Sequence, residues 1–508
     1  MDNATAYAAD ERRGDYQKFT SSKLIIILSL INCFVWMLLP STLESGLRLD
    51  VAEAAAFGPD FQLTYAKHPP LSFWLTALAA KLGPFRYIAV HALGAIFSTF
   101  AQYYVARFCQ RTMSEKAATV AILLGITSPF ATYLAIQFNH NIALMPFWAM
   151  TIGCALKAFE KNEAKQWALL GLVVGLALWA KYAIALLCLP LLCALLIVPE
   201  WRQSLKTIKP YVAIIVCLLI VMPHLTAVYQ QGGRTLQYAL RVWHNDFSER
   251  LANAFLIIYI AALSNLLMFV IVAVAGGYRN VAASLKSVTS SAFKLEPTAI
   301  FYTLAAFGPV LIIFYSAFLG IRVRSLWVTP ITLGFVFWWA HVAFNTEHTI
   351  SIRRAIIAAG TVYALHIAAY LSLRLIYPYK SEVRYPEIDA IKLTEEAQSY
   401  WRERKGQALR NIIIVGDQRS LQAAGSIAFN SRHRLLVRPQ QAIPFMRPVV
   451  INRIKTEGAL IVSVKRGGVN TQIPDTLGPF IVSNIESQKM PRTRGRADRT
   501  EIVFAIAQ

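Results

Sequence analysis

Charged residues are scarce in this chain, and acidic residues are the scarcest of them. Asp, Glu, Lys and Arg together make up 15% of the 508 residues, whereas an average soluble protein has about 25%. Hydrophobic residues account for 56% of the sequence, and the mean hydropathy is +0.46. This composition excludes an ordinary soluble enzyme of this length and indicates a protein that lies mostly within a membrane.

The sequence also lacks the common signatures of nucleotide and metal binding. It contains no GxGxxG fingerprint, no P-loop and no HExxH pair, and its nine histidines are scattered along the chain. Soluble nucleotide chemistry is therefore disfavoured. We predict no cofactor, and a divalent metal stays possible but unsupported by any motif.

Cysteine is rare and is confined to the apolar part of the chain. The six cysteines are Cys33, Cys109, Cys154, Cys188, Cys193 and Cys217. All of them lie in or at the ends of apolar segments, so they imply no disulfide framework. We interpret them as small apolar packing residues.

Basic residues outnumber acidic ones by 50 to 28, which gives a formal net charge of +22. In membrane proteins, Lys and Arg collect in cytoplasmic loops and at the level of the lipid headgroups. No zinc-finger spacing and no ordered aromatic platform accompanies the charge here. The basic excess therefore predicts contact with membrane lipids and not with nucleic acid.

Apolar segments of roughly 20 residues, the length that crosses a bilayer, recur along the first three quarters of the chain. Helices satisfy their own backbone hydrogen bonds in lipid. We therefore predict an α-helical polytopic membrane protein with about 11–13 transmembrane helices. The predicted spans are 23–40, 86–108, 116–135, 140–159, 166–180, 182–198, 210–229, 252–275, 298–319, 325–344 and 353–376.

Loop charges predict how the chain is oriented in the membrane. A charged leader precedes the first span and no small-residue cleavage site follows it, which indicates an uncleaved anchor with a cytoplasmic N-terminus. The loops 108–116, 160–166, 199–210 and 276–297 are basic and would then be cytoplasmic, as the positive-inside tendency requires. An odd number of spans places the C-terminus in the periplasm. The cations that fall on the outer side in this topology are Lys67, Lys81, Arg86, Arg322 and Arg324.

The character of the sequence changes after about residue 376. The segment 377–508 is rich in charge and proline, and strand-like stretches alternate in it with helical patterns. The strand-like stretches are 411–417, 459–464, 480–484 and 501–507, and the helical patterns are 387–404 and 418–429. We predict a transmembrane domain over 1–376, whose first periplasmic loop (41–85) holds interfacial helices, and a small periplasmic α/β domain over 377–508.

The first outer loop carries the residues best suited to chemistry. Asp50 and Glu53 are three residues apart, so a helix would place both carboxylates on one face just outside the membrane. A carboxylate there can accept a proton from an attacking hydroxyl, although a solvated first turn of a helix also favours acids. Lys67 and His68 precede a double proline, which starts a helix and holds both residues near the acids.

Three further polar clusters fall on the outer side, and they consist of Asn139, His140 and Asn141, of Lys181 and Tyr182, and of Trp243 and His244. The first cluster suits hydrogen bonding to sugar hydroxyls, or it caps a helix. Lys181 interrupts a long apolar stretch, where a lysine can bind phosphate as a point charge or extend towards the headgroups. Trp243 and His244 add an aromatic ring and an imidazole to a loop that also carries cations.

The chain resembles bacterial membrane glycosyltransferases of the GT-C class, in the group that includes the protein O-mannosyltransferases and the aminoarabinose transferases. The matching stretches are DVAE (50–53), HPPLSFW (68–74), KLGPFR (81–86), NHNIALMPFW (139–148), WALLGLVVGLALWAKY (167–182), SLWVTP (325–330) and IIIVGDQRSLQAAGSIAF (412–429). The order of these elements over most of the chain is more specific than any single motif. The chain departs from the family at His68, where such enzymes often have lysine, and at 139–141, where some relatives carry a second acid. The zinc ligands of the aminoarabinose enzymes have no clear counterpart.

The resemblance implies an inverting transfer of a sugar from a polyprenyl-phosphate donor to a lipid, glycan or protein acceptor on the periplasmic face. Lipid A and its core oligosaccharide are among these acceptors. Asp50 would be the catalytic base, with Glu53 as a weaker helper. The donor phosphate would be bound by Lys67, His68, Lys181, Arg322 and Arg324. The sugar or the acceptor would be bound by Asn139, His140, Asn141, Tyr182, Trp243 and His244.

Two other functions stay open. A transporter or flippase of a lipid-linked saccharide would concentrate polar residues at the bilayer midplane, often with inverted repeats. In this chain the polar residues lie at the ends of spans. A polysaccharide polymerase or ligase would use an undecaprenyl pyrophosphate donor and would carry a large outer loop late among the spans, not a domain after the last one. Both comparisons favour the sugar transferase.

Overall fold

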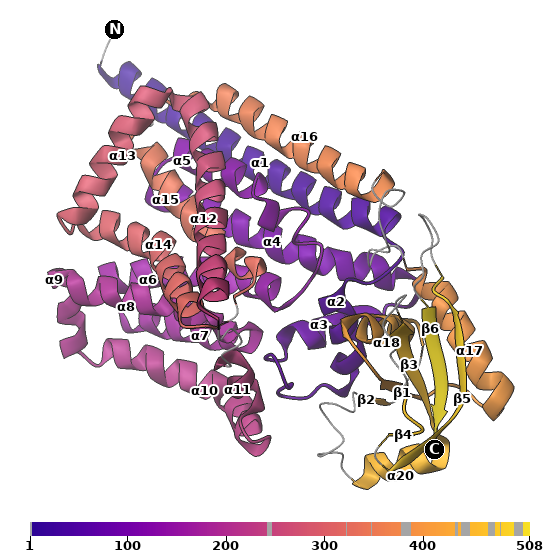
Figure 1. The fold of residues 1–508 in the computed structure, drawn as a ribbon. Coiled ribbons are helices and arrows are strands. Elements are labelled where there is room, and N and C mark those ends of the chain that lie inside the picture. The colour runs from indigo at the N-terminus through magenta and orange to yellow at the C-terminus, as the bar shows by residue number, and fades with distance from the viewer. Residues whose placement is uncertain are drawn as a thin grey trace.

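The protein combines a bundle of membrane helices with a sheet domain at one end of the bundle (Figure 1). The structure is a computed structural model. It describes residues 3–240, 246–321, 323–346, 348–376, 388–431, 435–437, 448–465, 473–477, 479–491 and 501–508.

A helix coincides with each predicted span. The long helices are α1 (Asn3–Leu43), α4 (Arg86–Thr112), α6 (His140–Lys161), α10 (Lys209–Gln230), α12 (Phe247–Gly276), α14 (Pro297–Phe318) and α16 (Ile352–Leu375). Within the described ranges, these seven helices are long and apolar enough to cross a membrane. An eighth span results if the bent pair Tyr182–Ile197 and Pro199–Lys206, which turns by 97°, is counted as one. This pair contains α8 (Ala185–Ile197) and α9 (Pro199–Arg202).

Three predicted spans are helices too short to cross a bilayer by themselves. They are α5 (Glu115–Ile126), α7 (Ala164–Ala180) and α15 (Ile331–Phe344), which have 12, 17 and 14 residues. At 1.5 Å per residue such helices reach about 18–26 Å, whereas the hydrocarbon core is about 30 Å thick. Length and composition thus support seven or eight spans, fewer than the 11–13 that hydropathy alone predicts.

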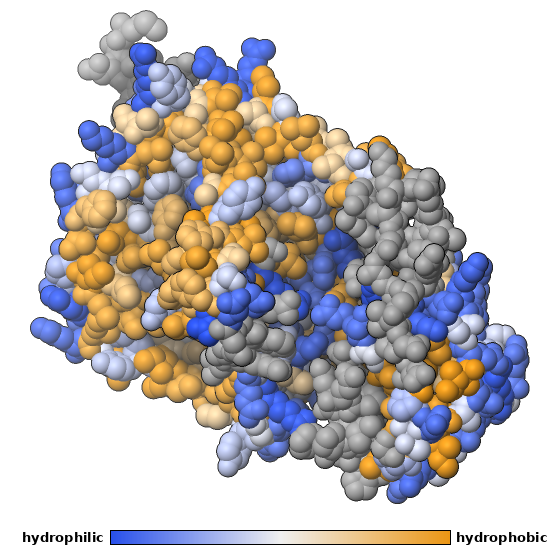
Figure 2. Space-filling view, viewed as in Figure 1, coloured by the Kyte–Doolittle hydropathy of each residue, from blue (hydrophilic) through white to orange (hydrophobic). Residues whose placement is uncertain are grey.

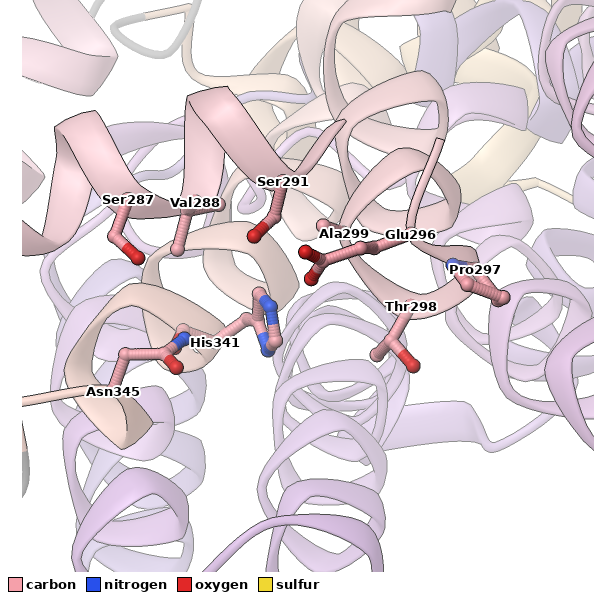
Figure 3. Close-up of a pocket in the computed structure, with 9 residues that line it drawn as sticks. All are labelled: Ser287, Val288, Ser291, Glu296, Pro297, Thr298, Ala299, His341 and Asn345. Carbon is pink, nitrogen blue, oxygen red and sulfur yellow. The ribbon is translucent and has the colours of Figure 1, made fainter. Parts of the chain in front are cut away.

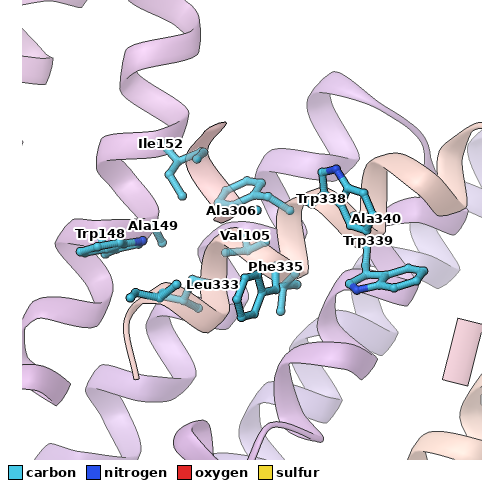
Figure 4. Packing of buried hydrophobic residues seen from close by; sticks show 14 of the residues in the cluster. Val105, Trp148, Ala149, Ile152, Ala306, Leu333, Phe335, Trp338, Trp339 and Ala340 are labelled. Atoms are coloured by element: carbon cyan, nitrogen blue, oxygen red, sulfur yellow. The ribbon is translucent and has the colours of Figure 1, made fainter. Parts of the chain in front are cut away.

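The core of the bundle lies around α6 and α15. Nearly every side chain of α15 is buried, because other helices surround it. Figure 4 shows how side chains of α4, α6 and α15 meet there, including Val105, Trp148 and Phe335. Because α15 is apolar on all sides, it fits only the interior of the bundle.

Other helices face outwards with apolar side chains. On α10, Ile214, Leu218, Leu219 and Met222 are all exposed. Figure 2 shows such hydrophobic residues spread over the helical part, whereas hydrophilic residues gather towards the sheet domain. Exposed apolar surface of this extent needs a lipid environment. The protein is therefore a multi-pass membrane protein.

The C-terminal domain contains a mixed sheet with the strand order β2-β1-β3-β6-β5-β4. The strands are β1 (Asn411–Ile414), β2 (Leu435–Val437), β3 (Ala459–Lys465), β4 (Thr476–Leu477), β5 (Phe480–Lys489) and β6 (Glu501–Ala507). The first three strands are parallel to one another, and β6 pairs antiparallel with β3 and β5. The helices α17 (Ala390–Lys405), α18 (Gln418–Asn430) and α20 (Pro448–Glu457) complete the domain. The four predicted strands are present, and the short strands β2 and β4 are additions.

The sheet domain packs against the loop that follows α1. This loop contains α2 (Leu49–Phe57) and α3 (Leu71–Ala80), and α18 lies directly on α2. A Cβ atom at Gly425 of α18 would overlap the carbonyl oxygen of Ala52, so the two backbones meet without a side chain between them. In addition, Arg86 Nη1 donates a hydrogen bond of 2.9 Å to the carbonyl of Phe429. The first loop and the sheet domain therefore lie at one end of the bundle, away from the N-terminus of α1 (Figure 1).

Candidate active site

Asp50 lies in the first turn of α2, at the end of the bundle that carries the sheet domain. Half of the other residues of α2 are alanines, whose small side chains let α3 and α18 approach closely. Asn139, which precedes α6, donates a hydrogen bond of 2.9 Å from Nδ2 to Asp50 Oδ2. Burial raises the pKa of Asp50, and Glu53 adds to the rise, while the Asn139 hydrogen bond and nearby cations oppose it. A carboxylate in this state is a stronger base than an exposed one.

Asn139 has two functions in the structure. Its Oδ1 accepts hydrogen bonds from the backbone N–H groups of Asn141 and Ile142, at 2.9 and 3.2 Å, and so caps α6. Because the oxygen is used for the cap, the amide NH₂ is directed at Asp50. The helix cap expected from the sequence is thus present, and it also holds the carboxylate.

Glu53 and Lys67 form an ion pair with an N–O distance of 2.6 Å. The side chains of both residues are largely buried, with 14% and 20% exposure. The predicted proximity of Lys67 to the acids is therefore present, but the charge of this lysine is balanced by Glu53. This pairing leaves less of its charge available for a donor phosphate.

His68 stacks on His140 with 3.6 Å between ring centroids, and the Tyr238 ring meets His68 edge-on at 5.7 Å. Burial and the charges of Lys181, Lys67 and Arg324 lower the pKa of His68 well below its usual range. His68 is therefore neutral at physiological pH. It offers a flat ring and a hydrogen-bonding nitrogen instead of the positive charge that a lysine would bring.

Lys181 is buried at the break between α7 and α8, where its side chain interrupts the apolar stretch. Its Nζ donates a hydrogen bond to Asn141 Oδ1 and lies 4.4 Å from the centroid of the Trp327 ring. Burial lowers the pKa of Lys181 to about 7, with the Asp50 carboxylate opposing and Arg324 assisting the shift. This lysine is therefore poised between its charged and neutral forms.

Arg324 is exposed and influences Asp50, His68 and Lys181 through its charge. Tyr182 points elsewhere: its hydroxyl is 2.7 Å from His224 Nε2, and His224 Nδ1 is 2.7 Å from the carbonyl oxygen of Leu63. The remaining predicted residues, Arg322, Trp243 and His244, lie outside the described residues.

Comparisons with known proteins show which proteins this chain resembles. The family model of the dolichyl-phosphate-mannose-protein mannosyltransferases matches residues 67–226. The chain is 30% identical over 222 residues to the lipopolysaccharide core galacturonosyltransferase RgtA of Rhizobium johnstonii. The matched region covers 42% of this chain and 42% of RgtA. The chain is 21% identical over 197 residues to the lipid A galacturonosyltransferase RgtD of the same organism, over 39% of this chain and 41% of RgtD. The chain thus spans well under half the length of these curated relatives.

The solved structures extend the likeness to nearly the whole chain. ArnT from Cupriavidus metallidurans bound to undecaprenyl phosphate matches with a TM-score of 0.63 and 12% identity, over 94% of this chain and 97% of ArnT. The apo state of the same protein gives 0.59 with 13% identity and the same coverage. The chain has the GT-C fold. The resemblance and the predicted helical membrane fold with a small C-terminal sheet domain are thereby confirmed, whereas the number of spans is lower than predicted.

The GT-C fold brings together residues that are far apart in the sequence. Asp50, Glu53, Lys67 and His68 come from the first loop, the 139–141 cluster from the start of α6, and Lys181 from the end of α7. Among the described residues of this chain, no group of three His, Cys, Asp or Glu side chains could hold a metal ion. Sequence reasoning did not single out Trp327, although it lies in the SLWVTP stretch.

A second cluster of polar residues, which sequence reasoning missed, surrounds Glu44 just after α1. The Glu44 carboxylate is fully buried and is paired with Arg48 at 2.6 Å and with Arg374 at 3.1 Å. The Tyr370 hydroxyl donates a 3.0 Å hydrogen bond to it, and His91 Nε2 lies 3.9 Å away. Burial would raise the pKa of Glu44, but the arginines overcome this effect and hold it at about 2. This cluster ties α1, α2, α4 and α16 together, and its member Arg48 lies two residues before Asp50.

Proposed function

We propose that this protein is an inverting glycosyltransferase of the bacterial inner membrane that moves a sugar from a polyprenyl-phosphate donor to an acceptor of the cell envelope. The main observation behind this proposal is the Asp50 carboxylate, which is hydrogen-bonded to Asn139. This carboxylate lies at the end of the bundle that carries the sheet domain, close enough to the buried Lys181 to influence its charge. The GT-C fold and the named activities of RgtA and RgtD support this proposal.

In the proposed reaction Asp50 accepts the proton of an acceptor hydroxyl. The hydroxyl oxygen then attacks the anomeric carbon of the donor sugar, and a new C–O bond forms. The bond between that carbon and the phosphate oxygen breaks, and the polyprenyl phosphate leaves with the electron pair. Because this is a single displacement, the configuration of the anomeric carbon inverts. The raised pKa of Asp50 favours the proton transfer.

The leaving phosphate gains negative charge, which positioned cations stabilise. We assign this role first to Lys181 and Arg324, because Lys67 is already paired with Glu53. The neutral pair of His68 and His140 forms a polar ring surface next to these cations, where the sugar can stack and form hydrogen bonds. Arg322, Trp243 and His244 stay candidates for phosphate and acceptor contacts.

The acceptor proposed first is lipid A or its core oligosaccharide, because RgtA and RgtD are named for these acceptors. Undecaprenyl phosphate is the proposed product lipid, since ArnT binds it. We further propose that the N-terminus is cytoplasmic and that residues 377–508 form a periplasmic domain next to the first loop (41–85). This orientation places the basic ends of the helices in the cytoplasm.

The transferase reading fits the structure better than a flippase or a polysaccharide polymerase. A flippase needs polar groups along a path through the bilayer, whereas Asp50, His68 and Lys181 gather at one end of the bundle. A polymerase or ligase would act on a pyrophosphate-linked donor. Supplying the donor as the monophosphate or as the pyrophosphate distinguishes the two enzymes.

The proposal predicts that Asp50→Asn lowers the transfer rate by about 10²–10⁴-fold, the usual contribution of a general base. The measurement follows radiolabelled sugar moving from a polyprenyl-phosphate donor to purified lipid A or core in vesicles that contain the full chain. The matched control is Asp60→Asn, an exposed acid of the same loop, which should retain the wild-type rate. Wild-type activity in Asp50→Asn would disprove the assignment.

A second variant separates the two functions of Asn139. Asn139→Ser keeps an oxygen that can cap α6 but removes the NH₂ donor to Asp50. We expect a thermal unfolding temperature near that of the wild type and a clearly lower transfer rate. A rate equal to wild type would show that the hydrogen bond to Asp50 is not used.

A further inference from the structure

A polar cavity of about 280 Å³ opens at the end of the bundle opposite Asp50. It lies between α13 (Tyr278–Phe293), the start of α14 and the end of α15, near the N-terminal end of the chain (Figures 1 and 3). Its polar lining consists of Ser287, Ser291, Glu296, Thr298, His341 and Asn345. The candidate active site uses none of these residues.

The sequence spacing makes these polar groups converge. Ser287 and Ser291 are four residues apart on α13, and His341 and Asn345 are four apart at the end of α15, so each pair shares one helix face. In Figure 3 the Glu296 carboxylate points towards Ser291 and the His341 ring. Three elements therefore direct hydrogen-bonding groups into one space.

Glu296 is an exposed acid whose carboxylate has no charged partner among the described residues. It precedes α14 in the N-cap position, yet its side chain does not cap the helix. Among the residues described, its carboxylate makes no hydrogen bond and no ion pair, and the same holds for the His341 ring. The described residues that line the cavity include no Lys or Arg. A cavity rich in hydrogen-bond acceptors, with one negative charge, is suited to bind a cation that carries hydrogen-bond donors.

The position of the cavity fits the headgroup layer of a membrane. The buried residues of α13 recur on one helix face, Val281, Ser284, Val288 and Ala292, so this helix is amphipathic and lies against the bundle. Phe293 and Leu295 are exposed beside the cavity, as expected for side chains that reach into lipid.

We propose that this cavity binds a primary ammonium group, carried by an aminophospholipid headgroup or by a small free amine. The ammonium would pair with Glu296 and donate hydrogen bonds to the serine hydroxyls. In a phospholipid the neighbouring phosphate would face the exposed lysines of α13 and its C-cap, Lys286 and Lys294.

The test uses the full chain in vesicles of phosphatidylcholine, with and without phosphatidylethanolamine, and measures the thermal unfolding temperature as the lipid is titrated. Phosphatidylethanolamine should raise this temperature in the wild type, because its amine carries N–H donors that choline lacks. Glu296→Gln should weaken the apparent affinity about tenfold, as expected for loss of a charge-assisted hydrogen bond. Ser291→Ala, which keeps the charge, should have a smaller effect. Glu200→Gln, an exposed acid at the same end of the bundle, should respond as the wild type does.

A second arm adds free ethanolamine to the protein in pure phosphatidylcholine. If ethanolamine alone raises the unfolding temperature and Glu296→Gln abolishes the rise, the ligand is a free amine. If only the phospholipid acts, the ligand is a headgroup. The proposal is overturned if neither amine acts on the wild type, or if Glu296→Gln responds like the wild type.

Discussion

Lys181 is a buried lysine whose burial costs stability and which we propose as a phosphate ligand. A lysine at the break between two apolar helices costs desolvation energy, which its hydrogen bond to Asn141 and its contact with the Trp327 ring partly offset. A lysine pKa of about 7, far below the usual 10.4 or so, records that cost. Binding of a phosphate would restore the charged form of the amine. The desolvation energy of Lys181 would therefore be offset only when the sugar donor is bound.

This state of Lys181 predicts a pH dependence of donor binding. The amine is protonated below its pKa of about 7 and neutral above it, so the attraction for phosphate is present at low pH and is lost as the pH rises. The apparent KM for the donor should therefore increase by up to about tenfold per pH unit above pH 7. Lys181→Arg should give a flat profile, since arginine stays charged, whereas Lys181→Met should bind donor weakly at every pH. Wild-type KM in Lys181→Met would contradict the assignment.

At the scale of the elements, the Glu44 cluster determines where α2 begins. Arg48 precedes α2 in the N-cap position but cannot cap it, because a guanidinium has no acceptor atom; it is paired with Glu44 instead. The partners from α4 and α16 fix that pair from two further sides. Because Asp50 follows two residues after Arg48, the cluster sets the position of the carboxylate that we propose as the base.

We expect Glu44→Gln to destabilise the protein by about 3–5 kcal/mol, because two buried arginines lose their counter-charge. The sign follows from the pKa of about 2, which lies below the ordinary value, so the contribution of Glu44 is present at neutral pH and is lost only in strong acid. Thermal or denaturant unfolding in detergent measures the change. Glu163→Gln removes a surface acid before α7 that is paired with Lys165 at 3.2 Å, and as the control it should change stability far less than Glu44→Gln does. Equal stability of both variants would mean that the cluster is not needed.

The contact of α18 with α2 gives another prediction at this scale. Gly425→Ala places a methyl group against the Ala52 carbonyl, so α18 must move away from α2. We expect a loss of about 1–3 kcal/mol in stability and a lower transfer rate. Gly360→Ala is the matched control, because a Cβ there meets nothing within 4 Å, and it should be neutral or slightly stabilising. Identical behaviour of the two variants would show that the contact is loose.

For the whole molecule, the proposed orientation predicts which positions are reachable from outside the cell. In a variant without native cysteines, single cysteines at Asp60 and Ser399 should react with a membrane-impermeant maleimide in intact spheroplasts. A cysteine at Thr289, on α13 at the other end of the bundle, should react only after the membrane is permeabilised. The reverse labelling pattern would invert the topology.

Much of the fold could be predicted from the sequence because lipid imposes a strong constraint on each segment separately. Hydropathy located the helices, and the lysine at 181 located the break between α7 and α8. The lengths of the helices were harder to predict from the sequence, because short buried helices such as α15 are as apolar as membrane-spanning helices. Strands β2 and β4 have only three and two residues, too few for a periodic pattern.

The candidate site was predicted in its parts but not in its connections. The hydrogen bond of Asp50 with Asn139 joins residues 89 positions apart, and no local pattern encodes such a contact. Glu44 was missed for a different reason. An acid at the end of an apolar span is usually solvated, whereas this one is buried by Arg374, which lies 330 positions later.

The backbone contact between Ala52 and Gly425 has a consequence for how the protein is made. The helix with the proposed base is synthesised early, but its partner α18 follows only after all the membrane helices. Under the proposed orientation, the proposed reaction centre of a nascent chain would stay incomplete until its final domain had been exported and folded. Sugar transfer by the proposed site would then begin only in fully translocated molecules, and the order of assembly would prevent premature transfer.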